Sequence, residues 1–163
     1  MLVIRCFLVF LLLGQSSAVA TTASNSGLPI PRFVSLKNDE TNIRTGPGTR
    51  YPIQWVYRRA AMPVEVIEEF DLWRKVRDAE GTTGWVHKSM VVGSRTVMIK
   101  GKEPHIVRLD ADLKSKPILK AEPSVIASLL ECQQNWCRIQ VSGRKGWIEK
   151  QYIWGAYKDE IFD

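Results

Sequence analysis

Gly84–Gly93 reads GWVHKSMVVG, and Gly146–Gly155 reads GWIEKQYIWG. The two stretches align over ten residues without a gap, and the first glycine, the tryptophan, the lysine and the last glycine are identical. Val86 in the first stretch and Ile148 in the second are both β-branched. Chance agreement of this kind is improbable, so the sequence predicts that one structural unit occurs twice.

The similarity continues upstream of these stretches. Residues 66–68 (VIE) precede Trp73 by the same spacing at which residues 129–131 (LLE) precede Trp136, and a β-branched residue follows each of these tryptophans by three positions. The two copies are offset by 62 to 63 residues. We therefore predict a duplicated unit of about 60 residues.

Each copy is predicted to consist of short β-strands. Runs rich in β-branched and aromatic residues indicate strands, and they cover residues 53–57, 64–67, 73–77, 83–86, 125–130, 136–141 and 145–148. Turn-forming residues separate these runs, and no segment has the apolar spacing of an amphipathic helix over three turns. This pattern predicts an all-β fold, a small barrel or a sandwich. Residues 87–90 and 149–152 are each predicted to form one 3₁₀ turn.

The first copy contains a motif that points to a known family. Asn42-Ile43-Arg44-Thr45-Gly46-Pro47-Gly48, followed by a tryptophan-led strand and then Gly84-Trp85-Val86, resembles the bacterial SH3 domain family. The resemblance covers Phe33 to Gly93 well. It covers Val97 to Gly155 more weakly, because residues 108–112 (RLDAD) lack the Gly-Pro of the first motif.

The resemblance implies barrels of five to seven strands that bind cell-wall peptides or envelope partners without catalysis. The tandem arrangement with a cysteine pair in the second copy also looks like exported SH3-domain proteins of Gram-negative bacteria. We therefore expect two SH3-like small β-barrels in tandem, covering residues 33–94 and 95–157, with a C-terminal tail at 158–163.

The N-terminal residues predict export. Arg5 precedes an apolar run over residues 6–13, and Ala18-Val19-Ala20 has the form of a signal-peptidase site. The run is shorter than the roughly 20 apolar residues that a membrane span needs. We predict a signal peptide over residues 1–20 and a flexible leader over 21–32, and an uncleaved N-terminal anchor remains the alternative. The expected location is periplasmic or secreted, without a stable transmembrane anchor.

The charge of the chain indicates no particular partner. The formal net charge is +6, but the basic residues are scattered in pairs and not clustered. This distribution favours a role in solubility over polyanion binding. Nucleic-acid binding is not expected, since export argues against it.

Two cysteines follow the predicted signal peptide. Cys132 and Cys137 flank a four-residue turn between predicted strands, and in an exported chain they are predicted to form a disulfide. The alternative is half of a zinc site, which only His87 and His105 could complete. We predict no metal and no cofactor.

In the repeat alignment, Glu69 and Arg74 occupy the places of the two cysteines. We therefore expect an ion pair in the first copy where the second has its disulfide. An exposed pair of this kind contributes at most about 1 kcal/mol.

Three residues are predicted to contact a ligand. Arg44 could hold a carboxylate of a wall peptide bidentately, or it could bridge two loops of the barrel. Tyr51 and Trp55 occur in the first copy alone and could line a surface groove or pack in the core. The repeated tryptophans, in contrast, occupy equivalent places and are expected to have a structural role in the two interiors, and these are Trp73, Trp85, Trp136 and Trp147.

The sequence has no arrangement typical of an enzyme. It lacks a Ser-His-Asp or Cys-His pattern near a recognisable elbow, an H-E-x-x-H motif and a phosphate-binding glycine loop. We expect a non-catalytic cell-envelope binding module that recognises peptidoglycan or wall peptides. The alternative is an adaptor that binds a segment of another exported protein.

Overall fold

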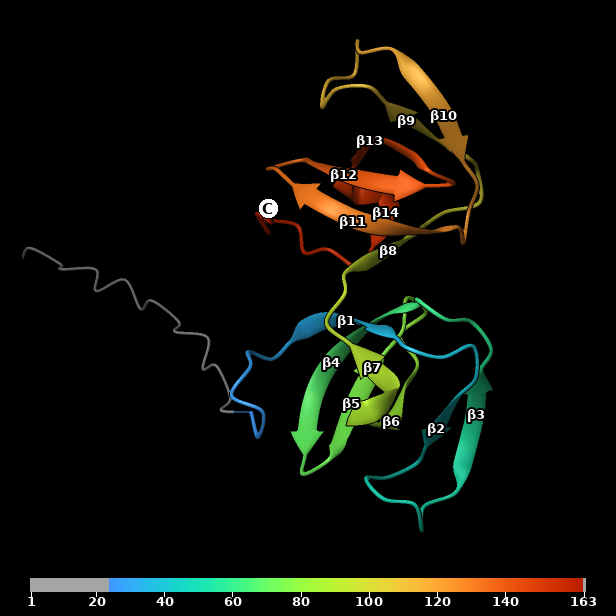
Figure 1. Cartoon of the computed structure of the whole chain (residues 1–163), viewed down its shortest axis with the longest axis vertical. Coiled ribbons are helices and arrows are strands. Elements are labelled where there is room, and N and C mark those ends of the chain that lie inside the picture. The colour runs from blue at the N-terminus through green and yellow to red at the C-terminus, as the bar shows by residue number, and fades with distance from the viewer. Residues whose placement is uncertain (1–23, 163) are drawn as a thin grey trace, which may run out of the picture.

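The computed structural model describes residues 24–162 and contains two antiparallel β-barrels that lie one above the other (Figure 1). The predicted all-β fold with two tandem SH3-like barrels is confirmed. The predicted signal peptide lies outside the described residues. In the part of the chain that the structure describes, no helix is long and apolar enough to cross a membrane.

The first barrel is a seven-stranded sheet in the order β3-β2-β6-β5-β4-β1-β7. Its elements are β1 (Arg32–Leu36), β2 (Thr41–Arg44), β3 (Ile53–Tyr57), β4 (Pro63–Phe70), β5 (Trp73–Arg77), β6 (Thr83–His87), the 3₁₀ turn η1 (Lys88–Met90) and β7 (Val91–Val92).

The second barrel repeats this order as β10-β9-β13-β12-β11-β8-β14. Its elements are β8 (Thr96–Ile99), β9 (His105–Arg108), β10 (Pro117–Ala121), β11 (Ile126–Cys132), β12 (Trp136–Val141), β13 (Arg144–Glu149), the 3₁₀ turn η2 (Lys150–Tyr152) and β14 (Ile153–Trp154). The strand orders match element by element, so one unit folds twice. Both predicted 3₁₀ turns are present.

The two cores consist mainly of aliphatic side chains. Ile43, Val64, Val66, Val76 and Val86 are at most 1% exposed in the first barrel. In the second barrel, a separate cluster contains Val97, Val107, Ile139 and Ile148 among its most buried members.

The repeated tryptophans do not belong to the two core clusters, and only Trp85 is buried, whereas Trp73, Trp136 and Trp147 are half-buried. Successive side chains of a strand point to opposite faces. Val86 belongs to the core, so Trp85 faces outward, although it is only 8% exposed. By the same alternation Val76 points inward and Trp73 outward, and Ile148 points inward and Trp147 outward. The tryptophans therefore belong to the outer faces of the sheets.

The hairpins β4–β5 and β11–β12 have the same register. Glu69 is paired with Arg74, and Cys132 with Cys137. Both hairpins also carry an irregularity at the same place, between Val66 and Glu68 and between Leu129 and Glu131. The disulfide joins Cys132 and Cys137, whose Cα atoms lie 4.1 Å apart.

The predicted ion pair in the first hairpin is present but is not exposed. Arg74 Nε lies 3.1 Å from Glu69 Oε1, and the two side chains are 8% and 0% exposed. Arg32 Nη2 also contacts this carboxylate at 2.6 Å, and Ser26 donates its backbone N–H and its hydroxyl, each at 2.8 Å. Ser26, within the predicted leader, thus binds the barrel.

These contacts determine the charge state of Glu69. Burial alone would raise the pKa of its carboxyl, but the hydrogen bonds from Arg32 and Ser26 and the charge of Arg74 hold the pKa below its ordinary value. Glu69 is therefore favoured in its ionised form, next to the buried Arg74 and the partly buried Arg32.

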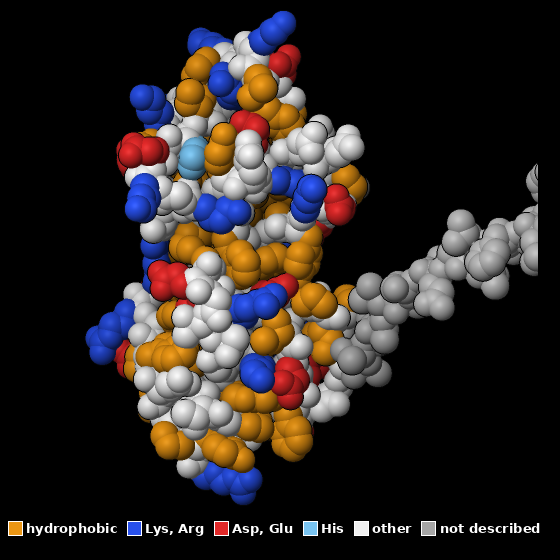
Figure 2. Space-filling model, turned by 180° about the vertical axis from the view of Figure 1, so that it is seen from behind, with side chains coloured by type: hydrophobic (Ala, Val, Ile, Leu, Met, Phe, Trp, Pro, Cys, Tyr) orange, Lys and Arg blue, Asp and Glu red, His pale blue; other side chains and the backbone are white. Residues whose placement is uncertain are grey.

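Aromatic and polar contacts join the two barrels. Phe33 of β1 packs edge-on against Trp154 of β14, with 5.1 Å between ring centroids, and at 4.7 Å against Tyr157. Trp154 Nε1 donates to the Pro63 carbonyl at 3.3 Å, and the Thr96 hydroxyl donates to the Ala61 carbonyl at 2.6 Å. Figure 2 shows hydrophobic side chains gathered along this seam.

Candidate functional site

A cleft of about 900 Å³ runs over the second barrel to the seam between the barrels. We call its outer part the loop groove, which is lined by Leu113, Gln134, Asn135, Trp136, Glu149 and Gln151. We call its inner part the seam end, which is lined by Phe33, Glu65, Arg77, Trp154, Tyr157 and Lys158. The two barrels therefore both contribute to one concave surface.

The start of β12 positions the aromatic side of the loop groove. Trp136 is the first residue of β12 and is paired with Glu149, the last residue of β13. The turn η2 follows directly, and Gln151 Nε2 donates to Glu149 Oε2 at 2.9 Å. A half-buried indole thus lies beside a carboxylate and the side-chain amides of Gln134 and Asn135.

The loop between β9 and β10 forms the opposite wall. Arg108 Nη1 donates to the Ser115 carbonyl at 2.9 Å, and the Ser115 hydroxyl donates to Asp110 Oδ2 at 2.9 Å. These bonds close the base of the loop, while Leu113 at its tip is 61% exposed. An exposed leucine opposite a half-buried tryptophan gives the groove two apolar sides.

Lys150 lines the cleft but serves the fold. Its Nζ donates to the carbonyls of Lys158 at 3.2 Å and Glu160 at 2.5 Å, and the residue is 8% exposed. Burial lowers the pKa of this amine below its ordinary value. These bonds tie the segment after Tyr157 to the second barrel.

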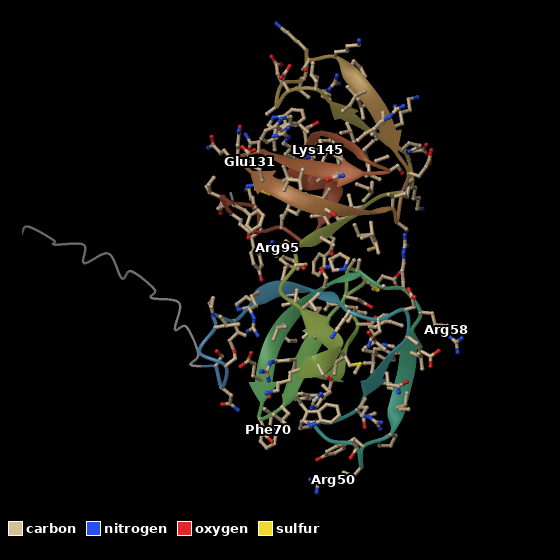
Figure 3. The ribbon with its side chains drawn as sticks, viewed as in Figure 1. Arg50, Arg58, Phe70, Arg95, Glu131 and Lys145 are labelled. Carbon is tan, nitrogen blue, oxygen red and sulfur yellow. A yellow bond between two sulfur atoms is a disulfide. The ribbon has the colours of Figure 1, made fainter. Side chains whose placement is uncertain are left out.

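The first barrel has a tryptophan at the equivalent corner. Trp73 is the first residue of β5 and is paired with His87, whose ring lies 5.5 Å away at a near-right angle. His87 Nδ1 lies 2.7 Å from the Ser89 hydroxyl. Phe70 and Leu72 beside Trp73 are 58% and 40% exposed, and Figure 3 shows Phe70 at the end of this barrel far from the seam.

A second tryptophan in each barrel lies in a row with cations on the outer sheet face. Trp85 is paired with Arg44 on one side and Lys75 on the other, and Lys75 Nζ lies 5.8 Å from the indole centroid. The corresponding row of the second barrel contains Arg108, Trp147 and Arg138. Both barrels thus keep an indole between two basic residues.

The structure places the three predicted ligand residues in and beside one loop. Arg44 Nη1 donates to the carbonyls of Thr49 at 3.1 Å and Tyr51 at 2.8 Å, so its guanidinium fixes the loop between β2 and β3. The Tyr51 ring packs on Gly46, where a Cβ would lie 2.5 Å from it.

Trp55 lies on the inner side of β3 and packs against the core of the first barrel. Arg44 and Tyr51 are therefore brought together, and Trp55 is separated from them by the sheet. Contact of these three residues with a ligand stays a prediction.

The sequence analysis missed Trp73 and Trp136 as site residues. Their signal was present, because each tryptophan is the first strand residue after the turn of its hairpin. The repeat predicts burial for these tryptophans, whereas the structure places both indoles half-buried at the start of a strand.

The described residues contain no group of three or more histidine, cysteine or acidic side chains that could hold a metal ion. Both sulfurs of the proposed alternative zinc site are joined in the disulfide.

Comparison with known proteins places both barrels in one sequence family. A family model described as "Bacterial SH3 domain" matches residues 37–93 and again residues 101–155. A curated protein of Bacillus subtilis (strain 168), "Putative N-acetylmuramoyl-L-alanine amidase YrvJ", is 24% identical over 148 residues. The match covers 80% of this chain and 28% of that protein, so the chain spans less than a third of the relative's length.

A solved structure is also similar. It is an NlpC/P60 family protein from Bacillus cereus ATCC 10987, with a TM-score of 0.34 and 13% identity over 74% of this chain and 55% of that chain. A likeness this distant supports no conclusion about function.

Proposed function

The chain belongs to the bacterial SH3 domain family, and from this premise we propose that it is a non-catalytic binding module of the cell envelope that recognises peptidoglycan. The binding element is the loop groove of the second barrel, with the Trp73 corner as its counterpart in the first. The proposed location is periplasmic or secreted.

One observation carries this proposal: a half-buried tryptophan, Trp136, lines a groove of the second barrel. The first barrel has a half-buried tryptophan, Trp73, at the equivalent strand position. Aromatic-lined grooves of this kind hold extended peptides, and an indole face can also pack on a sugar ring. The side-chain amides of Gln134, Asn135 and Gln151 could donate to the carbonyls of a bound peptide.

The curated relative supports an association with the cell wall. Its printed name is that of an amidase, and the region similar to this chain is 28% of its length. The chain therefore corresponds to a part of that protein. The described residues of this chain form two SH3-like barrels, and the proposed role is attachment to the wall.

Sedimentation with purified sacculi tests the proposal. The protein should pellet with sacculi, and Trp136→Ala should reduce the retained fraction severalfold, because it removes the aromatic wall of the groove. Ile161→Ala is the matched control, since Ile161 is a 65% exposed apolar residue outside the cleft lining. Equal retention of folded Trp136→Ala and wild-type protein would contradict the proposed groove.

The non-catalytic assignment has its own test. Sacculi incubated with the purified protein should release no soluble wall fragments beyond a buffer control. Release of such fragments in proportion to protein concentration would overturn the assignment.

The adaptor alternative is favoured by the exposed apolar side chains beside Trp73. Phe70 and Leu72 together present an apolar surface that suits a protein partner. An adaptor should capture a protein from envelope extract. Phe70→Ser should abolish that capture, whereas Trp136→Ala in the loop groove should leave it unchanged.

A further inference from the structure

We infer that the seam end of the cleft binds the free carboxylate of a wall peptide, and that Arg77 of the first barrel supplies the cation. This inference rests on the proposed function and adds to it a ligand group and a second barrel. Binding then needs both barrels, since Arg77 belongs to β5 and Trp136 belongs to β12.

A buried carboxylate holds Arg77 in place. Glu65 Oε2 accepts hydrogen bonds from Arg77 Nε at 2.9 Å and from Arg77 Nη2, and the Glu65 side chain is 4% exposed. Glu65 Oε1 accepts a further bond from the Tyr157 hydroxyl at 2.9 Å. Both oxygens of Glu65 are therefore occupied, and the orientation of the guanidinium is fixed.

The opposite edge of the guanidinium is available. The bonds to Glu65 use the edge formed by Nε and Nη2, whereas Nη1 makes no hydrogen bond to any of the described residues. The Arg77 side chain is 44% exposed and lines the cleft. The remaining N–H groups of Nη1 and Nη2 form a fork that matches a carboxylate bidentately. Because the fork is already oriented, less conformational entropy is lost on binding.

The other charges of the cleft favour an anion. Lys100 and Lys158 are exposed lining residues, and within residues 24–162 neither amine forms an ion pair. Lys150 is occupied with backbone carbonyls, and Glu149 accepts from Gln151. The charges of Glu65 and Arg77 balance each other, and the three lysines then outnumber Glu149 in the lining. The cleft therefore attracts a carboxylate electrostatically.

The second barrel shows that the fold does not require this arrangement. Glu65 is paired with Arg77 across β4 and β5, and the equivalent pair across β11 and β12 is Ser128 with Gln140. The second barrel therefore forms the same hairpin without an ion pair at this position. The pair occurs where the first barrel meets the cleft, which is the place where a held cation can reach a ligand.

Titration calorimetry with one synthetic peptide in two forms tests the inference. The probe is a tetrapeptide of wall stem sequence, either with its carboxylates free or with every carboxylate amidated. The wild-type protein should bind the free form about tenfold more tightly. Arg77→Gln should remove that preference, and Arg77→Lys should restore part of it. Arg59→Gln, which removes an exposed charge outside the cleft lining, should keep the wild-type preference.

Further variants keep the test decisive if Arg77→Gln does not fold. The double variant Glu65→Gln, Arg77→Gln removes both charges of the ion pair together, so that Glu65 is not left as a buried, unpaired carboxylate, and it should also lose the preference. Equal affinity for the two peptide forms, or an unchanged preference in either folded Arg77→Gln or the double variant, would overturn the inference.

The proposed function fails separately. If the protein pellets with sacculi through Trp136 but binds the free and the amidated peptide equally, the proposed function stands and this inference is wrong. If the protein prefers the free peptide through Arg77 but does not pellet with sacculi, the carboxylate site stands and the proposed function is wrong.

Discussion

The first glycine of each ten-residue repeat has no room for a side chain. A Cβ on Gly84 would lie 2.2 Å from Ile43 Cγ2, and one on Gly146 would lie 2.4 Å from Ile118 Cδ1 and 2.8 Å from the Arg108 carbonyl oxygen. Gly84 of β6 lies against β2, and Gly146 of β13 lies against β9 and β10. The glycine of the Gly-Trp pair is thus a requirement of barrel closure.

Gly146→Ala should therefore destabilise the protein by about 1–3 kcal/mol, because the added methyl group displaces core and backbone atoms. Gly93→Ala is the control, since a Cβ there would meet no atom within 4 Å. Urea unfolding of both variants measures the difference. Equal losses of unfolding free energy in the two variants would show that close approach is not the reason for the motif.

The direction in which the four repeated tryptophans face could not be predicted from the sequence. The strands around Trp73, Trp85, Trp136 and Trp147 were predicted, but a period of two does not say which of its two faces points inward. The presence of Val86 and Ile148 in the cores settles the direction. The sequence predicts that the cores are apolar. It does not predict that the tryptophans face outward, and therefore does not predict the groove, because both depend on how neighbouring strands are paired.

Hairpins β4–β5 and β11–β12 show how one element can be fastened in two ways. The cross-strand partners were predictable from the repeat alignment, because equivalent positions in a hairpin face the same partner. The contacts of Ser26 and Arg32 with Glu69 were not predictable, because the leader has no periodic pattern that assigns it a place. These contacts turn a pair expected to be exposed into a buried cluster.

Glu69→Ala should cost about 3 kcal/mol or more, because it leaves two largely buried arginines without their shared carboxylate. Replacement of both Cys132 and Cys137 by serine should cost about 2 kcal/mol, since the disulfide closes a short loop. Denaturant unfolding of the two variants gives the comparison. A smaller loss in Glu69→Ala than in the double serine variant would contradict the stronger role assigned to the ion cluster.

The same carboxylate makes stability depend on pH. The pKa of Glu69 in the folded protein lies below the ordinary value of 4.5, so its contribution is fully present above 4.5 and is lost as pH falls toward the folded pKa. Glu160 has its pKa lowered as well, since hydrogen bonds and the charge of Arg95 outweigh the effect of burial. The melting temperature should fall as pH decreases below about 4.5, and Glu69→Gln should show a shallower decline. Parallel curves for wild type and variant would contradict this origin.

At the scale of the whole molecule, the seam is made from positions where the two copies differ. Trp154 of β14 stands where the first copy has Val92, and Phe33 of β1 stands where the second copy has Thr96. The sequence repeat predicts that the same fold occurs twice, but it does not predict how the two copies contact each other. The cleft could therefore not be predicted from the repeat, since its seam end depends on these substitutions and on Tyr157, outside both matched segments.

Arg95 connects the parts that meet at this seam, and Figure 3 shows it between the two barrels. Its guanidinium nitrogens contact Glu160 at 2.6 and 3.0 Å and the Gly155 carbonyl at 2.7 Å. Its Cζ lies 5.8 Å from the Phe33 ring centroid and 5.2 Å from that of Phe162. One side chain therefore touches the first barrel, the second barrel and the tail.

Arg95→Ala should uncouple the barrels, because Glu160 is left without its cation at a site where both side chains are at most 17% exposed. The wild-type protein should melt in one calorimetric transition, and the variant should show two, the lower one shifted downward by several degrees. Arg58→Ala, which removes an exposed pair separated by 3.9 Å, should melt like the wild type. Solution X-ray scattering should report a larger radius of gyration for Arg95→Ala alone. A single unshifted transition with an unchanged radius would mean that the aromatic contacts of Phe33 hold the barrels together without the arginine.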